Sequence, residues 1–189
     1  MAGETQKTTA LTNRDDGELR NARLVQSGLT YSLDTHQFAA ATELEAADNL
    51  IMNIPLPSNC IVQEIAMYND DMDTDATPTL VLDFGVAAAQ DYTSVTSGTS
   101  TKHSKDDIID ADLFVDGSTT GQAATTNWTV QTPDATTWGP EDALKPVWEL
   151  LGYDEDPNTT FNLVVQSATA SAALASAADM AVRVAYLID

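Results

Sequence analysis

The chain has 189 residues, 43% of them hydrophobic, and its 29 acids against eight lysines and arginines give a formal charge of −21. This apolar content predicts one folded domain with its own core. So acidic a surface argues against nucleic acid and against membranes as partners. The N-terminus lacks the apolar stretch of a secretory signal, and no run approaches the 18 apolar residues of a membrane span, so we expect a protein of cytosolic origin. The acid excess also fits adaptation to a saline habitat.

The first 23 residues differ from the rest of the chain in charge. They contain four acids and four bases and are therefore neutral, while residues 24–189 carry the whole charge of −21. Their Thr, Asn, Asp and Gly residues are typical of a segment that a partner orders. We predict an extended N-terminal arm over residues 1–24 and a single domain over residues 25–189. The candidate contacts to a neighbour are the four bases of the arm, Lys7, Arg14, Arg20 and Arg23, because arginine favours ion pairs at interfaces. A solubilising tail is the alternative.

In chain order, alternating and β-branched segments predict the first strands. These strands cover residues 29–38, 50–54, 60–68 and 79–86. Pro55 and Pro57 lack the amide hydrogen that a central strand donates, so we expect the second strand to end before them. Between the first two strands, residues 39–49 predict a loop or a short helical turn. Cys60, the only cysteine, is expected to be a small buried hydrophobe and cannot form an intrachain disulfide.

The second half of the chain is less regular until its end. Ser104 is a possible N-cap ahead of apolar residues, which predicts a short helix over residues 104–114. Residues 126–132 predict a strand, and two prolines limit any helix over residues 139–151. Two final strands are predicted over residues 159–166 and 180–188. Within the last strand one face carries Val182, Val184 and Tyr186, and the other carries Ala181, Arg183, Ala185 and Leu187.

Many short strands, long connections and no sustained helical period predict an all-β fold. The expected architecture is an antiparallel β-sandwich or jelly-roll-like domain, with the extended arm and one or two short helices.

The sequence contains no arrangement of residues that is typical of an enzyme, and it predicts no catalytic, cofactor-binding or metal-ligating residue. His36 and His103 lie far apart, and we expect both at the surface rather than in a zinc site. The acidic run from Asp70 to Asp75 has oxygen ligands at the spacing that calcium uses, yet it lacks the glycine and distant glutamate of an EF-hand loop. A turn of solvated aspartates is the favoured interpretation, and the same holds for the turn from Asp154 to Asp156.

The three tryptophans allow two interpretations. Together they could form a surface on which sugars stack, or they could belong to the core or to subunit contacts. The second is favoured because of their apolar neighbours, Val130, Val147 and Leu150. The tryptophans are Trp128, Trp138 and Trp148.

Three segments resemble a group of small structural proteins from tailed bacteriophages. The first two are Asn49-Leu-Ile-Met-Asn-Ile-Pro-Leu-Pro and Ile61-Val-Gln-Glu-Ile-Ala-Met. The third is an acidic turn followed by Thr77-Pro-Thr-Leu-Val-Leu-Asp-Phe-Gly-Val. The apolar strand, alanine-rich link and last strand over residues 158–189 also match this group. The resemblance covers residues 48–86 and 158–189 and leaves the middle of the chain unmatched.

This resemblance implies a head decoration, or cement, protein that is made in the bacterial host cytoplasm and resides on the outer capsid surface of the virion. Its implied partner is the major capsid protein, whose neighbouring capsomers it would bridge. A homotrimer is favoured, since three copies repeat each weak contact. No cofactor, nucleic acid or membrane is implied. The alternative function is a carbohydrate-binding or host-attachment module of a head fibre or tail, which would use the tryptophans and a calcium-binding acidic turn.

Overall fold

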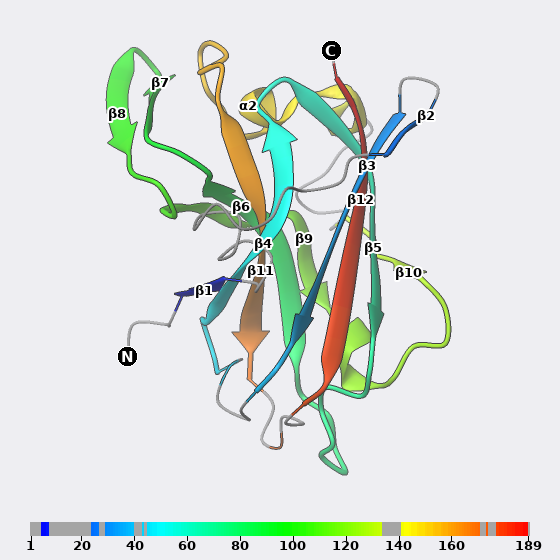
Figure 1. The fold of residues 1–189 in the computed structure, drawn as a ribbon. Helices are drawn as coiled ribbons and strands as arrows, with labels where there is room; N and C mark the ends of the chain where they lie inside the picture. Colours follow the sequence, from blue (N-terminus) through cyan, green and yellow to red (C-terminus); the bar gives the residue numbers. More distant parts are fainter. Residues whose placement is uncertain are drawn as a thin grey trace.

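The computed structural model describes residues 5–7, 24–26, 29–39, 43, 45–133, 141–170, 173 and 177–188. Most of this part of the chain forms long strands, and two sheets of these strands pack face to face (Figure 1). The all-β sandwich predicted from the sequence is therefore confirmed. The described helices are a single α-helical turn and two 3₁₀ turns, so they are as short as expected.

The strands and helices have the following bounds. The strands of the first half are β1 (Thr5–Lys7), β2 (Leu24–Gln26), β3 (Leu29–Gln37), β4 (Asn49–Pro57), β5 (Cys60–Asn69) and β6 (Val81–Ala88). Those of the second half are β7 (Tyr92–Thr96), β8 (Thr99–His103), β9 (Ile108–Ser118), β10 (Thr129–Val130), β11 (Thr160–Thr169) and β12 (Asp179–Ile188). The helical turns are η1 (Thr120–Gln122), η2 (Asp142–Leu144) and α2 (Val147–Leu150).

The strand order is that of a jelly roll. Sheet A has the order β1-β4-β11-β6-β9, and sheet B has the order β10-β5-β12-β3-β2. Four strands from the first half pair antiparallel with four from the second half in reverse sequence, namely β3 with β12, β4 with β11, β5 with β10 and β6 with β9. Such nested pairs correspond to one long hairpin rolled into two sheets. Of the other four strands, β1 and β2 lie at the edges of sheets A and B, and β7 and β8 form a separate hairpin.

The core fills the space between the two sheets. In β12, Val182, Val184 and Tyr186 share one face, as predicted, and this face is the buried one, because successive side chains of a strand point to opposite faces. Sheet A contributes Phe84, Phe161 and other fully buried side chains to the same cluster. Cys60 is buried in this core, which confirms its prediction.

Two strands contradict the sequence predictions. Residues 108–118 form β9 rather than a helix, because Ile109 and Leu113 pack on the sandwich core while the backbone pairs with β6. β4 continues through Pro55 and Pro57 instead of ending before them. The reason is that β1 pairs only with Asn49–Ile51, so no described strand pairs with the far edge of β4 at the prolines. The strand expected over residues 126–132 is reduced to the two residues of β10.

The pairing between β6 and β9 is irregular at Gly85, in the middle of β6. The pairing shifts register on both sides of this residue, from Phe84 opposite Val115 to Val86 opposite Asp110. A Cβ atom on Gly85 would lie 2.0 Å from the carbonyl oxygen of Asp110. Only glycine therefore lets the β9 backbone cross β6 this closely.

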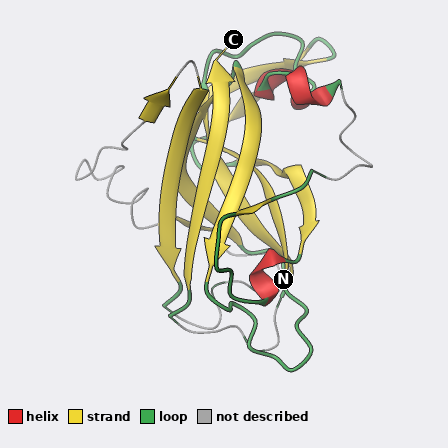
Figure 2. Ribbon diagram, turned by 90° about the vertical axis from the view of Figure 1, so that its right-hand side faces the viewer, coloured by secondary structure: helices red, strands yellow, loops and turns green. Residues whose placement is uncertain are grey.

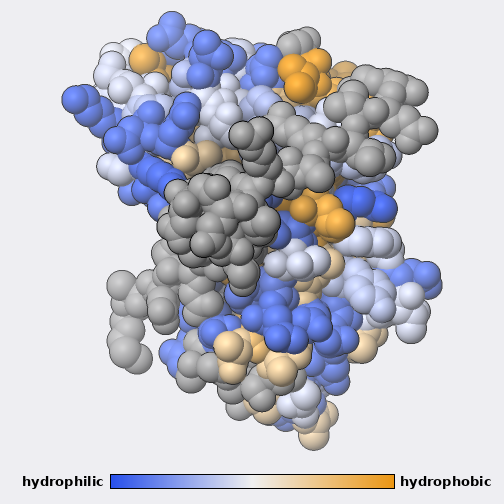
Figure 3. Space-filling view, viewed as in Figure 1, coloured by the Kyte–Doolittle hydropathy of each residue, from blue (hydrophilic) through white to orange (hydrophobic). Residues whose placement is uncertain are grey.

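The surface seen from the direction of Figure 1 is mostly hydrophilic, with hydrophobic side chains gathered in small areas (Figure 3). Within the described ranges, no helix has the length and apolar character needed to cross a membrane.

Candidate interaction surfaces

The predicted arm meets the domain at two sheet edges. Thr5–Lys7, as β1, pairs in parallel with Asn49–Ile51 at the edge of sheet A. Leu24–Gln26, as β2, pairs with β3 at the edge of sheet B. Lys7 thus lies in a strand of the sandwich. The three arginines of the arm, Arg14, Arg20 and Arg23, lie outside the described residues, so their role and the boundary between arm and domain stay predictions.

The acidic turn after β5 is held by its own backbone. Asp73 is 1% exposed, and its Oδ2 accepts the amide hydrogens of Thr79 at 2.7 Å and of Leu80 at 2.8 Å. Its Oδ1 accepts that of Asp75 at 3.3 Å. The prediction of a solvated turn is therefore wrong for Asp73, whose carboxylate replaces the backbone partners that a tight loop lacks. Both oxygens being engaged, the geometry gives no support to a calcium ligand there.

The second acidic turn fastens the β7–β8 hairpin to the domain. The carboxylate of Asp154 accepts the amide hydrogens of Ser97, at 3.1 Å, and of Gly98, at 2.7 Å, in the turn of that hairpin. Asp156 accepts the amide hydrogen of Asn158 at 2.8 Å. Among the described residues, no group of three or more histidines, cysteines and acids is placed to hold a metal ion.

Both histidines are partly buried and lie against aromatic rings, contrary to the surface positions predicted for them. His36, on β3, meets Phe38 edge-on with ring centroids 4.8 Å apart. Burial lowers the pKa of His36, and Glu43, 3.7 Å away, opposes this effect. His103, on β8, stacks on Tyr92 at 4.7 Å, and its Nε2 is 2.9 Å from the Ser94 hydroxyl. These contacts give both rings a structural role.

The two described tryptophans lie in different places, and Trp138 is outside the described residues. Trp148 is partly buried in α2. Trp128 precedes β10 and is 37% exposed, with its ring 6.2 Å from that of Tyr68. The guanidinium carbon of Arg183 lies 4.9 Å from the centre of the Trp128 ring. Arg183 thus occupies one face of the ring that sugar stacking would use.

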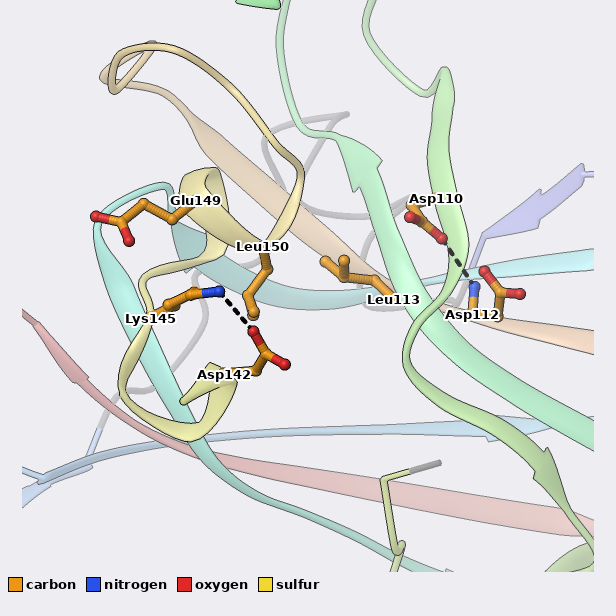
Figure 4. A pocket seen from close by; sticks show the side chains of 7 residues that line it. All are labelled: Asp110, Asp112, Leu113, Asp142, Lys145, Glu149 and Leu150. Carbon is orange, nitrogen blue, oxygen red and sulfur yellow. Dashed lines mark hydrogen bonds and ion pairs between the residues drawn. The ribbon is translucent and has the colours of Figure 1, made fainter. Parts of the chain in front are cut away.

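A cleft of about 230 Å³ lies between β9 and the segment that carries η2 and α2 (Figure 4). Lys145 pairs with Asp142 at 2.7 Å on one side, and Asp110 and Asp112 of β9 line the other. Burial, together with the side-chain hydrogen bond to Asp112, raises the pKa of Asp110 to about 6, although the hydrogen bond from the Asp112 amide opposes this effect. The lining contains four carboxylates and a single ammonium group, with no histidine or cysteine.

Sequence reasoning missed the gathering of Tyr68, Trp128 and Arg183 on the outer face of sheet B. The alternation in β12 did place Arg183 opposite the core residues, and Tyr68 lies at an exposed position next to the end of β5. What no pattern showed is that β5 and β12 are neighbours, because they are far apart in the chain.

No known protein family model matches the chain, and no curated protein matches it significantly. Two solved structures share its fold. A chain in the capsid of Ralstonia phage GP4 matches with a TM-score of 0.60 and 17% identity, and the match covers 98% of each chain. A chain in the capsid asymmetric unit of cyanophage Pam1 matches with a TM-score of 0.53 and 19% identity, over 92% of this chain and 96% of that one. The chain therefore has a fold that occurs, over nearly its whole length, in two assembled phage capsids.

Proposed function

We propose that this protein is a decoration protein of a tailed phage head, which binds the outer surface of the major capsid protein lattice and bridges neighbouring capsomers. The observation that carries the proposal is the length of the two structural matches. Each match covers more than nine-tenths of both chains, and both matched chains come from phage capsids. The resemblance of residues 48–86 and 158–189 to small phage structural proteins supports it independently.

The charge distribution suits this role. A domain with the charge of −21 that residues 24–189 carry repels other particles when it coats a shell. The arm holds half of the chain's bases, so its arginines can pair with carboxylates of a neighbouring subunit. Attachment to the shell then depends on non-covalent contacts and not on a catalysed reaction, and the protein is not an enzyme. A trimer would multiply each contact by avidity.

Binding to heads tests the proposal. Deleting residues 2–24 would also remove β1 from sheet A, so charge replacement in the full chain is the cleaner change. The variant carries Arg14→Gln, Arg20→Gln and Arg23→Gln. Its matched control carries Lys102→Gln and Lys105→Gln, two exposed bases around the end of the β7–β8 hairpin. Each protein is mixed with undecorated heads of the phage that encodes it, and the bound fraction is measured after pelleting.

We expect the wild type and the lysine control to bind, and the arginine variant to bind about tenfold or more weakly, because interfacial ion pairs of arginine are lost. Binding of all three proteins with equal affinity would contradict the role of the arm. Failure of the wild type to bind heads at all would contradict the decoration function.

A further inference from the structure

A hollow of about 530 Å³ lies on the outer side of sheet B, where β3 and β5 end and β12 begins. Figure 2 turns the side with β3, β12 and β5 toward the viewer. The volume lies within the range of roughly 300–1,000 Å³ that is typical of small-molecule sites. Its outward-facing lining residues are Thr35, Gln37, Tyr68, Asp70, Asp179 and Ala181.

The pairing of three strands forms this hollow. Ala181 of β12 lies between Thr35 of β3 and Tyr68 of β5 in one row, and Asp179 lies opposite Gln37 in the row beyond. Side chains in such rows stand side by side on the same face of a sheet. Because alanine has the shortest side chain of its row, the middle strand is lower than the strands on either side of it.

Asp70, which directly follows β5, is held in this lining by two hydrogen bonds to the start of β12. Its Oδ2 accepts the amide hydrogen of Asp179 at 3.0 Å, and its own amide hydrogen is donated to the carbonyl oxygen of Asp179 at 2.9 Å. No described residue makes a hydrogen bond to the side chains of Thr35, Gln37 or Asp179. The hollow is thus built from fixed backbone, and its polar side chains are available to a ligand.

The lining combines an aromatic ring with hydrogen-bonding groups of both kinds. Tyr68 is 43% exposed, and the face of such a ring packs against the C–H groups of a sugar ring. Thr35 and Gln37 both donate and accept hydrogen bonds, whereas the carboxylates of Asp70 and Asp179 accept them. Sugar hydroxyl groups also donate and accept, so they match this set of groups.

Charge narrows the class of ligand. Among the described residues, no lysine or arginine lines the hollow, and Arg183, two positions farther along β12, is already paired with Glu64 at 2.7 Å. Two carboxylates without a base repel phosphate, sulfate and acidic sugars. A basic side chain would pair with the carboxylates but would offer no acceptor to the donors of Thr35 and Gln37.

We propose that this hollow binds a neutral saccharide, with the Tyr68 ring as its stacking platform and the surrounding polar side chains as partners of its hydroxyl groups. Stacking on Trp128 is opposed by Arg183, whose guanidinium carbon lies 4.9 Å from the centre of that ring. The inference goes beyond the proposed function and does not rest on it, because the lining of the hollow alone carries it.

The test uses the full chain and four neutral trisaccharides, namely maltotriose, mannotriose, cellotriose and triacetylchitotriose. Saturation-transfer NMR detects binding, and titration to about 20 mM sugar measures a dissociation constant near 1 mM. Tyr68→Ala removes the platform, and Ala181→Leu fills the floor of the hollow. The matched control is Leu187→Ala, at an exposed position near the other end of β12. Circular dichroism checks that each variant is folded.

We expect at least one of the sugars to bind the wild type and Leu187→Ala equally, and to bind Tyr68→Ala and Ala181→Leu about tenfold or more weakly. Because the ligand is neutral, its affinity should be the same in about 0.1 M and about 1 M NaCl. Binding of none of the four sugars would overturn the proposal, and so would binding that neither hollow variant weakens. Binding of agmatine, a guanidinium compound, without binding of any sugar would also overturn it, and would assign the hollow to a basic side chain of a partner.

Discussion

The two outer faces of the sandwich are both apolar at their centres, but they differ in how far the rest of the chain covers these apolar side chains. On sheet A, Ile51, Ala87 and Val164 are fully buried, and Ile108 and Ala111 of the irregular strand β9 pack against them. On sheet B, the corresponding surface stays open, with Leu33 and Val130 about half exposed. An apolar outer position therefore does not by itself indicate a partner. The decisive difference is whether the chain covers that position itself, and on sheet B it leaves Leu33 and Val130 exposed.

Introducing a threonine on each face tests this difference. Ile51→Thr places a hydroxyl in the closed cluster of sheet A, and we expect it to lower the free energy of unfolding by about 2 kcal/mol through lost packing and polar burial. Leu33→Thr on sheet B should change the same quantity by less than about 0.5 kcal/mol, because the side chain is half exposed. Urea unfolding at low protein concentration measures both. Equal losses would mean that the two faces do not differ.

A smaller effect on the free energy of unfolding is expected from replacing Asp110, which lies on β9. Its pKa is raised from 3.8 to about 6, so the folded chain binds this proton more tightly than the unfolded chain does. That contribution to stability is present below about pH 4 and is lost as the pH rises through 6. Asp110→Asn keeps the acceptor oxygen for the Asp112 amide and removes the charge.

We expect Asp110→Asn to be about 1 kcal/mol more stable than the wild type at pH 7, after allowance for solvent screening, and equal to it at pH 3.5. Thermal unfolding across this pH range provides the measurement. Glu155→Gln, which removes an exposed carboxylate near α2, is the control and should show no such trend. A variant that gains nothing at pH 7 would show that the Asp110 charge is well solvated in the cleft.

The sequence predicted the strands whose patterns are local. Residues 29–38, 60–68 and 180–188 alternate or are β-branched, and each became a strand with nearly the expected bounds. The sandwich followed from their number and from the lack of a helical period. The predicted helix over residues 104–114 failed because the Ser104 signal is local, whereas the pairing of β9 with β6 and its packing on two clusters are tertiary.

The interaction surfaces were harder to predict. Asp73 was expected to be solvated, since nothing in the sequence shows that the amides of Thr79 and Leu80 turn back toward it. The exposed apolar residues on the outer side of sheet B could not be predicted as a group either. They come from β3, β5, β10 and β12, which are adjacent only through the jelly-roll order. The charge division between residues 1–23 and the rest was plain from the sequence, and it remains the basis of the arm hypothesis.

The most direct test of a virion role is the copy number of this chain in purified particles, measured against the major capsid protein by quantitative mass spectrometry. A lattice-wide decoration protein predicts about one copy per capsid subunit, because each symmetry-related site is filled. A handful of copies per particle would contradict the lattice-wide role. Complete absence of the chain from particles would contradict the virion assignment itself.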